Sequence, residues 1–158
     1  MIKNKLKQLN LAQPIAIIGA GVTGKSCFDL LRLASIDCHV FDESRQLPRA
    51  FTGWQDHVSL GEFTDATFAD YGTILLSPGV DTRRACFAEV QEKLLTDIEL
   101  FARLTTKPVV GVTGSNGKST VVSLLSDVCQ TAKRNYILCG NIGLPVLQAL
   151  SFGTCPNT

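Results

Sequence analysis

Two glycine-rich segments constrain the fold of this chain more than any other feature. "GAGVTGKS" occupies residues 19–26 and "GVTGSNGKST" occupies residues 111–120. Each follows an apolar run and precedes residues whose apolar side chains recur at helical spacing. Glycines after a buried strand let the backbone turn tightly, and the helix that follows directs free N–H groups and its positive dipole end at an anion. The sequence therefore predicts two strand–loop–helix units that bind anions.

The residues around the first loop predict a parallel α/β sheet. Short, continuous apolar runs are typical of strands that are buried on both faces. Strands are expected at 14–19, 36–42, 57–61 and 71–79. Helices are expected at 24–34, 83–94 and 96–104, the last with Thr96 and Glu99 in a capping-box pattern. This alternation favours a Rossmann-like domain at residues 1–96.

The pattern restarts near residue 105. Further elements are expected as a strand at 107–114, a helix at 118–132, a strand at 135–141 and a helix at 144–150. Residues 97–158 are therefore interpreted as the start of a P-loop NTPase-type α/β domain. Its strands are fewer than a parallel sheet usually contains. We accordingly expect the chain to be the N-terminal part of a longer protein.

Composition excludes several classes of function. The formal net charge of +1 gives no electrostatic footprint for nucleic acid or for an anionic membrane surface. The six cysteines form no C-x-x-C pair and only two histidines are present, so zinc-site spacing is absent. Such cysteines are expected to be free thiols in a reducing cytoplasm. The apolar run near the N-terminus is much shorter than the roughly 20 residues that span a bilayer, so no membrane insertion is expected.

The second loop carries the side chains expected of a triphosphate site. Gly114 and Gly117 permit a tight backbone around an anion, and Lys118 can reach the β- and γ-phosphates of ATP. Ser119 is the candidate Mg²⁺ ligand. The predicted ATP-binding residues are Gly114, Ser115, Asn116, Gly117, Lys118, Ser119 and Thr120. Val112 stands where strict spacing requires a glycine, so a plain strand-to-helix turn is the alternative.

The first loop fits two patterns at once. Gly19, Gly21 and Gly24 form a G-x-G-x-x-G dinucleotide pattern, and the same segment satisfies G-x-x-x-x-G-K-S. Asp42 ends the next expected strand, where such folds bind a ribose or a base. A site for a nucleotide or nucleotide diphosphate is favoured. A triphosphate loop and a purely structural turn are the alternatives.

The order of the motifs resembles the Mur ligase family, in particular its D-glutamate-adding members. "GVTGSNGKST" followed by "GNIGLP" resembles the central ATP-binding domain of that family. "GAGVTGKS", "SPGV" and "DIELF" precede it in the family's order, so the resemblance extends from Ile15 to Leu150. It implies a Rossmann-like domain that binds the UDP part of the substrate and a P-loop domain that binds ATP.

The resemblance implies roles for residues near the first loop. Val22 and Thr23 would contact the uracil region, with Asp42 beside it. The family often has a Thr-Arg pair directly after this aspartate. Here the run is "DESRQ", so Ser44 or Arg45 would take that contact.

Residues further along the chain also gain roles from the resemblance. Ser77 and Gly79 would lie along the path of the UDP-sugar, and Asn141 would meet the diphosphate. In the family reaction, ATP phosphorylates the carboxylate of UDP-N-acetylmuramoyl-L-alanine and the amine of D-glutamate then attacks the acyl phosphate, a step of peptidoglycan precursor synthesis. Lys118, with Mg²⁺, would be catalytic because it offsets charge on the phosphoryl group.

The resemblance also implies that essential parts lie past residue 158. These are a further magnesium-binding carboxylate, a histidine, a modified lysine and a third domain. We therefore expect this chain alone to form no amide bond, and the full-length enzyme to be a monomer.

Two alternatives come from other classes of protein. An NAD(P)-dependent oxidoreductase would explain the glycines of the first loop and Asp42, but would leave residues 117–120 unexplained. A non-catalytic UDP-sugar-binding module would tolerate Lys118→Ala without any measurable change. Titration with NADH and with the UDP-sugar separates the oxidoreductase from the ligase.

Overall fold

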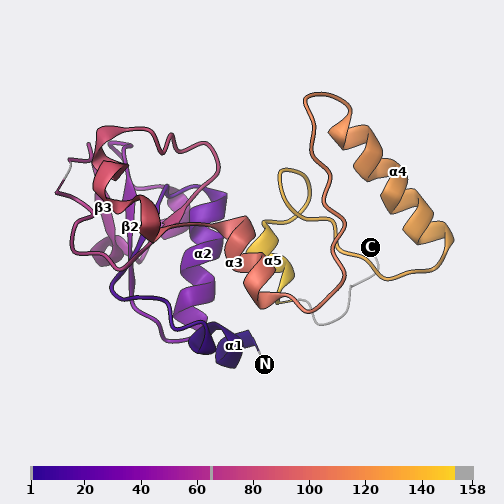
Figure 1. The fold of residues 1–158 in the computed structure, drawn as a ribbon, viewed down its shortest axis with the longest axis horizontal. Coiled ribbons are helices and arrows are strands. Elements are labelled where there is room, and N and C mark those ends of the chain that lie inside the picture. Colours follow the sequence, from indigo (N-terminus) through magenta and orange to yellow (C-terminus); the bar gives the residue numbers. More distant parts are fainter. Residues whose placement is uncertain (1, 65, 152–158) are drawn as a thin grey trace.

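A computed structural model describes residues 2–64 and 66–151 of the chain. It contains an all-parallel sheet of five strands in the order β3-β2-β1-β4-β5. The sheet lies on the left-hand side of Figure 1, where β2 and β3 are labelled. The strands are β1 (Ile15–Ile18), β2 (Cys38–Asp42), β3 (Val58–Leu60), β4 (Thr73–Leu76) and β5 (Leu94–Thr96). The α-helices are α1 (Ile2–Gln8), α2 (Val22–Leu33), α3 (Asp97–Leu104), α4 (Lys118–Thr131) and α5 (Val146–Ala149). The predicted Rossmann-like fold is confirmed.

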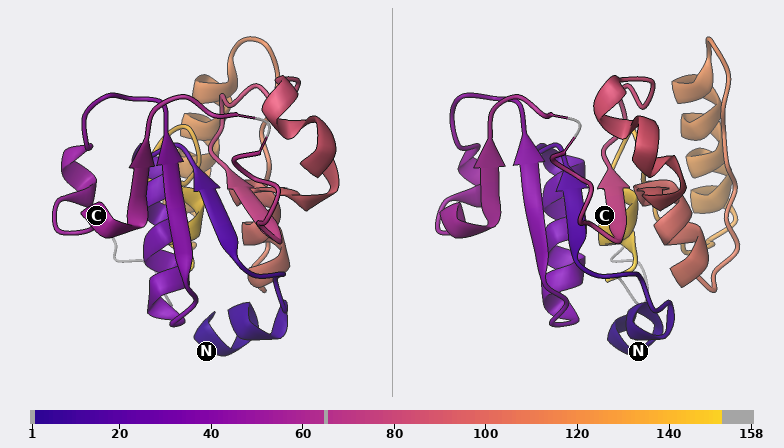
Figure 2. Two further views of the ribbon diagram at one scale, coloured as in Figure 1. Left: turned by 90° about the vertical axis from the view of Figure 1, so that its left-hand side faces the viewer. Right: turned by 60° about the vertical axis from the view of Figure 1, so that its left-hand side comes forward.

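The central strands are apolar on both faces because both faces are covered. Every residue of β1 and of β4 is buried. One face, with Ile15, Ile17 and Leu75, belongs to a core shared with α1, α2, α3 and α5. The other face, with Ala16 and Ile18, packs on a second cluster rich in phenylalanine. Figure 2 shows the strands side by side and α2 against the sheet.

Two predicted helices next to the sheet are present. The first, α2, begins at Val22, two residues before the expected start, and buries Cys27, Phe28, Leu30 and Leu31 among others. The second, α3, begins after Thr96, whose Oγ1 accepts a hydrogen bond from the Glu99 amide at 3.1 Å. The capping position read from the sequence is therefore confirmed.

The predicted α-helix at 83–94 is wrong. Residues Ala85–Lys93 form 3-10 turns (η3) that are interrupted at Val90, whose φ of −124° and ψ of 19° are not helical. Strand β5 follows at once and pairs with β4 in the register Leu75↔Leu95. Leu94 and Leu95 fit a helical spacing, but pairing with an existing strand edge outweighs this local preference. Two shorter 3-10 turns, η1 (Arg49–Phe51) and η2 (Gln55–His57), and α1 were also not predicted.

The predicted strands at 107–114 and 135–141 are wrong, whereas the helices that follow them are present. In the described part of the chain, this region holds a single β-bridge, between Cys139 and Leu144. A parallel strand needs a neighbour for its hydrogen bonds, and no ladder in the described residues reaches 107–114. Val109 and Val110 are accordingly 59% and 77% exposed.

The two helices of the second half differ in their surroundings. No residue of α4 is buried, and this helix lies apart from α2 and the sheet (Figure 1). Helix α5, in contrast, places Val146 and Leu147 in the core that contains α2 and α3. The chain therefore returns to the Rossmann-like core after α4. The domain division between residues 96 and 97 stays a prediction.

Candidate nucleotide-binding site

In the first glycine loop, the backbone at the start of the loop lies close to the first turn of the following helix. A Cβ atom on Gly24 would lie 1.7 Å from the carbonyl oxygen of Gly19, so only glycine fits there. Gly19 has a φ of +97° and donates its N–H to the Phe41 carbonyl at 2.7 Å. The loop thus follows β1, is hydrogen-bonded to the carboxyl end of β2, and leads directly into α2. Gly21 is less constrained, since a Cβ there would meet no atom within 4 Å.

Asp42 holds this loop in place. Its two carboxylate oxygens accept hydrogen bonds from the Ala20 amide at 2.6 Å and from the Ser44 amide at 2.8 Å. Burial acts to raise the pKa of Asp42, but these hydrogen bonds to the charged form together outweigh it and leave the pKa below its usual value. Each oxygen keeps a second lone pair, so Asp42 can also accept a hydrogen bond from a ligand hydroxyl.

The first lysine does not face its loop. Helix α2 begins at Val22, so Lys25 is already the fourth helical residue. Its Nζ lies 2.5 Å from the Asp29 carboxylate, one turn further along the helix. It also lies 6.0 Å from the ring centroids of Phe28 and Phe51. This geometry favours the nucleotide or nucleotide-diphosphate interpretation of the first loop over the triphosphate interpretation.

The second lysine stands in a different register. Lys118 is the first residue of α4, directly after Gly117, which caps the helix with a φ of +77°. The ammonium group donates hydrogen bonds to the carbonyls of Gly114 and Ser115, the latter at 3.2 Å. The lysine therefore reaches back across its own loop, where a phosphate would meet the first amides of the helix. The two loops share a sequence pattern but differ in where the helix starts.

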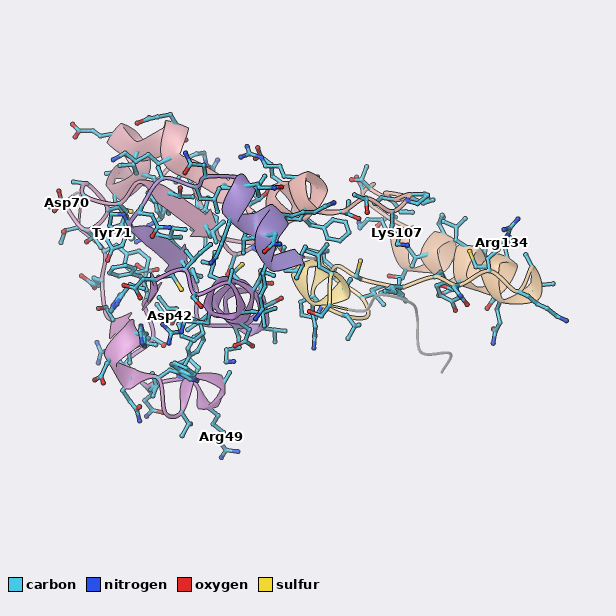
Figure 3. The ribbon with its side chains drawn as sticks, turned by 90° about the horizontal axis from the view of Figure 1, so that it is seen from below. Asp42, Arg49, Asp70, Tyr71, Lys107 and Arg134 are labelled. Atoms are coloured by element: carbon cyan, nitrogen blue, oxygen red, sulfur yellow. The ribbon has the colours of Figure 1, made fainter. Side chains whose placement is uncertain are left out.

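The two loops belong to different parts of the molecule. In Figure 3, Asp42 lies in the part that holds the sheet, whereas Lys107 and Arg134 lie on the side that carries α4. Ser115, Asn116, Ser119 and Thr120 are exposed on that side. Their roles on ATP stay predictions.

Ser77 brings the end of β4 against the first loop. A Cβ atom on Gly19 would lie 2.9 Å from the Ser77 Oγ, and the Ser77 amide donates to the Ile18 carbonyl at 3.1 Å. The Ser77 Oγ is buried and has no hydrogen-bond partner among the described residues. Ser77 and Gly79 line a hollow of about 280 Å³ at this edge of the sheet.

Comparison with known proteins decides between the families that such a site admits. The family model of the Mur ligase MurD-like N-terminal domain matches residues 13–99. The chain belongs to the MurD-like Mur ligases. The match covers the sheet, the first loop and Asp42, and it ends in the first turn of α3.

Curated relatives extend the similarity of this MurD-like chain beyond the matched domain. Each of the following is a UDP-N-acetylmuramoylalanine--D-glutamate ligase. The Haemophilus influenzae (strain PittEE) protein is 37% identical over 145 residues, the Marinobacter nauticus protein is 36% identical over 144, and the Coxiella burnetii (strain Dugway 5J108-111) protein is 34% identical over 146. These alignments cover 85% to 87% of this chain but 32% of each relative. The chain thus spans about a third of the length of these relatives.

Four residues with predicted ligand contacts lie wholly or partly at the surface of the protein. Val22 is 72% exposed in the first turn of α2, Thr23 beside it is half-buried, and Arg45 is exposed after β2. Asn141 is exposed in a turn that the hydrogen bond from the Leu144 amide to the Leu138 carbonyl closes. The proposed roles of these four residues stay predictions.

Asp97 is a residue of this edge that sequence reasoning assigned only to a helix. It follows β5 directly, is 5% exposed and lines the same hollow as Ser77. Burial raises the pKa of its carboxyl above the usual range, against the hydrogen bonds from nearby backbone amides. The signal in the sequence was an aspartate directly after the Leu-Leu-Thr run of β5, and it was missed because β5 was not predicted.

The described residues also limit other chemistry. Within 2–64 and 66–151, no group of three or more His, Cys, Asp or Glu side chains could hold a metal ion. No helix in this part is long and apolar enough to cross a membrane. Cys27, Cys38, Cys129 and Cys139 are free thiols, and burial raises the pKa of Cys38 to about 12. Buried thiols with raised pKa values are poor nucleophiles.

Proposed function

We propose that this chain is the substrate-binding and ATP-contacting part of a ligase that joins D-glutamate to UDP-N-acetylmuramoyl-L-alanine in peptidoglycan precursor synthesis. The first loop holds the UDP part of the substrate and the second loop holds ATP. The observation that carries this proposal is the position of each lysine in the helix after its loop. Lys118 is the first residue of α4, whereas Lys25 is the fourth residue of α2. Membership in the MurD-like family and the names of the curated relatives support the substrate.

The UDP-binding role follows from the start of α2. Gly21 caps this helix without a side-chain hydrogen bond, so the first amides of α2 are available to an anion. The diphosphate would lie there, with the nucleoside toward β2 and Asp42. Ser77 and Gly79 follow β4 and line the hollow at its carboxyl end, where the sugar would continue. Asn141 would complete the contacts to the diphosphate.

ATP and Mg²⁺ fit the second loop. The first amides of α4 and the Lys118 ammonium would bind the β- and γ-phosphates, with Ser115, Asn116 and Thr120 supporting them. The exposed Ser119 hydroxyl is a hard oxygen ligand beside the lysine, and Mg²⁺ commonly takes its remaining ligands from phosphates and water. When bound, Mg²⁺ neutralises charge on the phosphates. Lys118 contributes by holding positive charge at the same oxygens.

Calorimetric titration of the 158-residue chain tests the UDP-binding role. We expect binding of UDP-N-acetylmuramoyl-L-alanine and of UDP, and no binding of NADH at the same concentrations. Preferred binding of NADH would instead support an oxidoreductase, and the family membership argues against that outcome.

Catalysis by this chain alone is not expected. The reason is that the chain spans about a third of the length of the ligases it resembles. D-glutamate-dependent release of ADP by the chain alone would contradict this. We further propose a cytoplasmic location, consistent with the free thiols, and a monomeric full-length enzyme.

A further inference from the structure

The parallel strands place four candidate ligand groups in a row. The carboxyl ends of β2, β1, β4 and β5 lie at one edge of the sheet, in that order. Asp42 ends β2, the first glycine loop follows β1, Ser77 follows β4, and Asp97 follows β5. Neighbouring strands are about 4.8 Å apart, so the row spans about 14 Å. A nucleoside diphosphate joined to a sugar is long enough to lie along it.

The β5 end of this row is a hollow with one charged group. The hollow of about 280 Å³ is lined by Ser77, Gly79, Thr82, Asp97 and Ile98, among others. Asp97 is 5% exposed, whereas Ile98 beside it is 53% exposed. A ligand in the hollow would therefore meet apolar and hydroxyl groups and a single carboxyl group.

Among the described residues, no cation is paired with Asp97. The hydrogen bonds found at its carboxylate come from backbone amides, such as that of Ile98 at 2.9 Å. No Lys, Arg or His side chain in the described ranges forms an ion pair with it. Burying an unpaired carboxylate is unfavourable. The carboxylate of Asp97 thus has backbone donors but no cation in the described part, and the buried Oγ of Ser77, at the end of the neighbouring strand, has no hydrogen-bond partner there. Together they indicate a site that a ligand completes.

We propose that Asp97 determines specificity for the sugar part of the substrate. Its carboxylate accepts a hydrogen bond from a hydroxyl or amide N–H of the sugar or of the acyl group attached to it. A carboxylate repels phosphates, so the diphosphate lies on the β1 side of Ser77 and the sugar lies over β4 and β5. The proposal rests on the proposed UDP-sugar function. It adds Asp97 as the residue that recognises the sugar part of that substrate.

Calorimetric titration of Asp97→Asn in the 158-residue chain tests the proposal with two ligands. UDP ends at the diphosphate and cannot reach β5, whereas UDP-N-acetylmuramoyl-L-alanine can. We expect the substitution to weaken binding of the UDP-sugar about tenfold and to change binding of UDP less than twofold. Glu99→Gln is the matched control, because Glu99 loses the same charge in the same helical turn but does not line the hollow. It should leave both affinities unchanged.

The possible outcomes distinguish a failure of the role of Asp97 from a failure of the proposed UDP-sugar binding. Wild-type chain that binds neither ligand would contradict the proposed function itself. Wild-type chain that binds both, with Asp97→Asn binding both equally well, would contradict only the role of Asp97. An equal loss for both ligands would indicate a structural role and would also overturn the proposal.

A second variant decides the matter if Asp97→Asn does not fold, as judged by circular dichroism. Ile98→Trp enlarges an exposed side chain that lines the hollow, so it should fill the space without disturbing the core. We expect it to weaken the UDP-sugar at least tenfold and to leave UDP unchanged. Unchanged binding of the UDP-sugar would show that the sugar does not occupy the hollow.

Discussion

Single residues decide how each loop can act. At the first loop, Gly24 permits the contact with Gly19 that brings the strand end against the helix start. At the second, Lys118 opens its helix and reaches back across the loop. Lys25 also stands between a glycine and a serine, but its ammonium group forms an ion pair with Asp29. We therefore propose that the ligand of each loop depends on the position of its lysine relative to the first residue of the following helix, which the spacing of the motif alone does not reveal.

Gly24→Ala should destabilise the chain and weaken UDP binding. The added Cβ would lie 1.7 Å from a backbone carbonyl oxygen, so the loop must move. Such overpacking typically lowers the free energy of unfolding by roughly 1–3 kcal/mol. Urea unfolding and UDP titration measure the two effects. Gly21→Ala, whose Cβ meets nothing within 4 Å, should lose less than about 1 kcal/mol. Equal losses in the two variants would contradict the steric explanation.

The buried carboxyl group of Asp97 should lower the free energy of unfolding as pH rises. Its pKa in the folded state lies above the ordinary value of 3.8 because burial disfavours the charged form. The unfolded chain therefore releases this proton at lower pH than the folded chain, and the folded state loses relative stability above the unfolded pKa. We expect the free energy of unfolding of Asp97→Asn, minus that of wild type, to increase from pH 4 to pH 7. Urea unfolding across this range measures it, and a difference that falls with pH would contradict the burial.

At the scale of elements, the sequence predicted correctly those strands and helix ends that depend on neighbouring residues in the chain. The runs at β1 and β4 were predictable because both faces of these strands are buried. The start of α3 was predictable because Thr96 caps it by accepting a hydrogen bond from the backbone amide of Glu99, within one turn. Strand β5 was not, since its assignment depends on pairing with β4, which is distant in sequence. Asp97 was missed as a site residue for the same reason.

Thr96→Ala should weaken α3 specifically. The hydroxyl accepts the Glu99 amide at 3.1 Å, and losing an N-cap of this kind lowers the free energy of unfolding by about 1 kcal/mol. Thr131→Ala, at the exposed last residue of α4, is the control and should change stability by less than about 0.5 kcal/mol. Chemical unfolding compares the two. A larger loss for Thr131→Ala would contradict the capping role.

At the scale of the molecule, the two loops differ in how firmly they are supported. The first loop rests on a sheet covered on both faces. The second leads into α4, which has no buried residue and exposes Val121, Leu124 and Val128. Low burial lowers the free energy of local opening. We expect amide hydrogen exchange to be markedly faster in α4 than in α2, a helix of similar length. Equal protection of the two helices would contradict this difference in support.

The central claim is that two loops of similar sequence hold different nucleotides. Titration of Mg-ATP against wild type, Lys118→Ala and Lys25→Ala tests it most directly. A lost hydrogen bond between a charged side chain and phosphate is worth about 1.5–3 kcal/mol, so Lys118→Ala should bind ATP roughly 10- to 100-fold more weakly. Lys25→Ala should bind ATP within about twofold of wild type, because Lys25 pairs with Asp29. Loss of ATP binding in Lys25→Ala, with retention in Lys118→Ala, would contradict the claim.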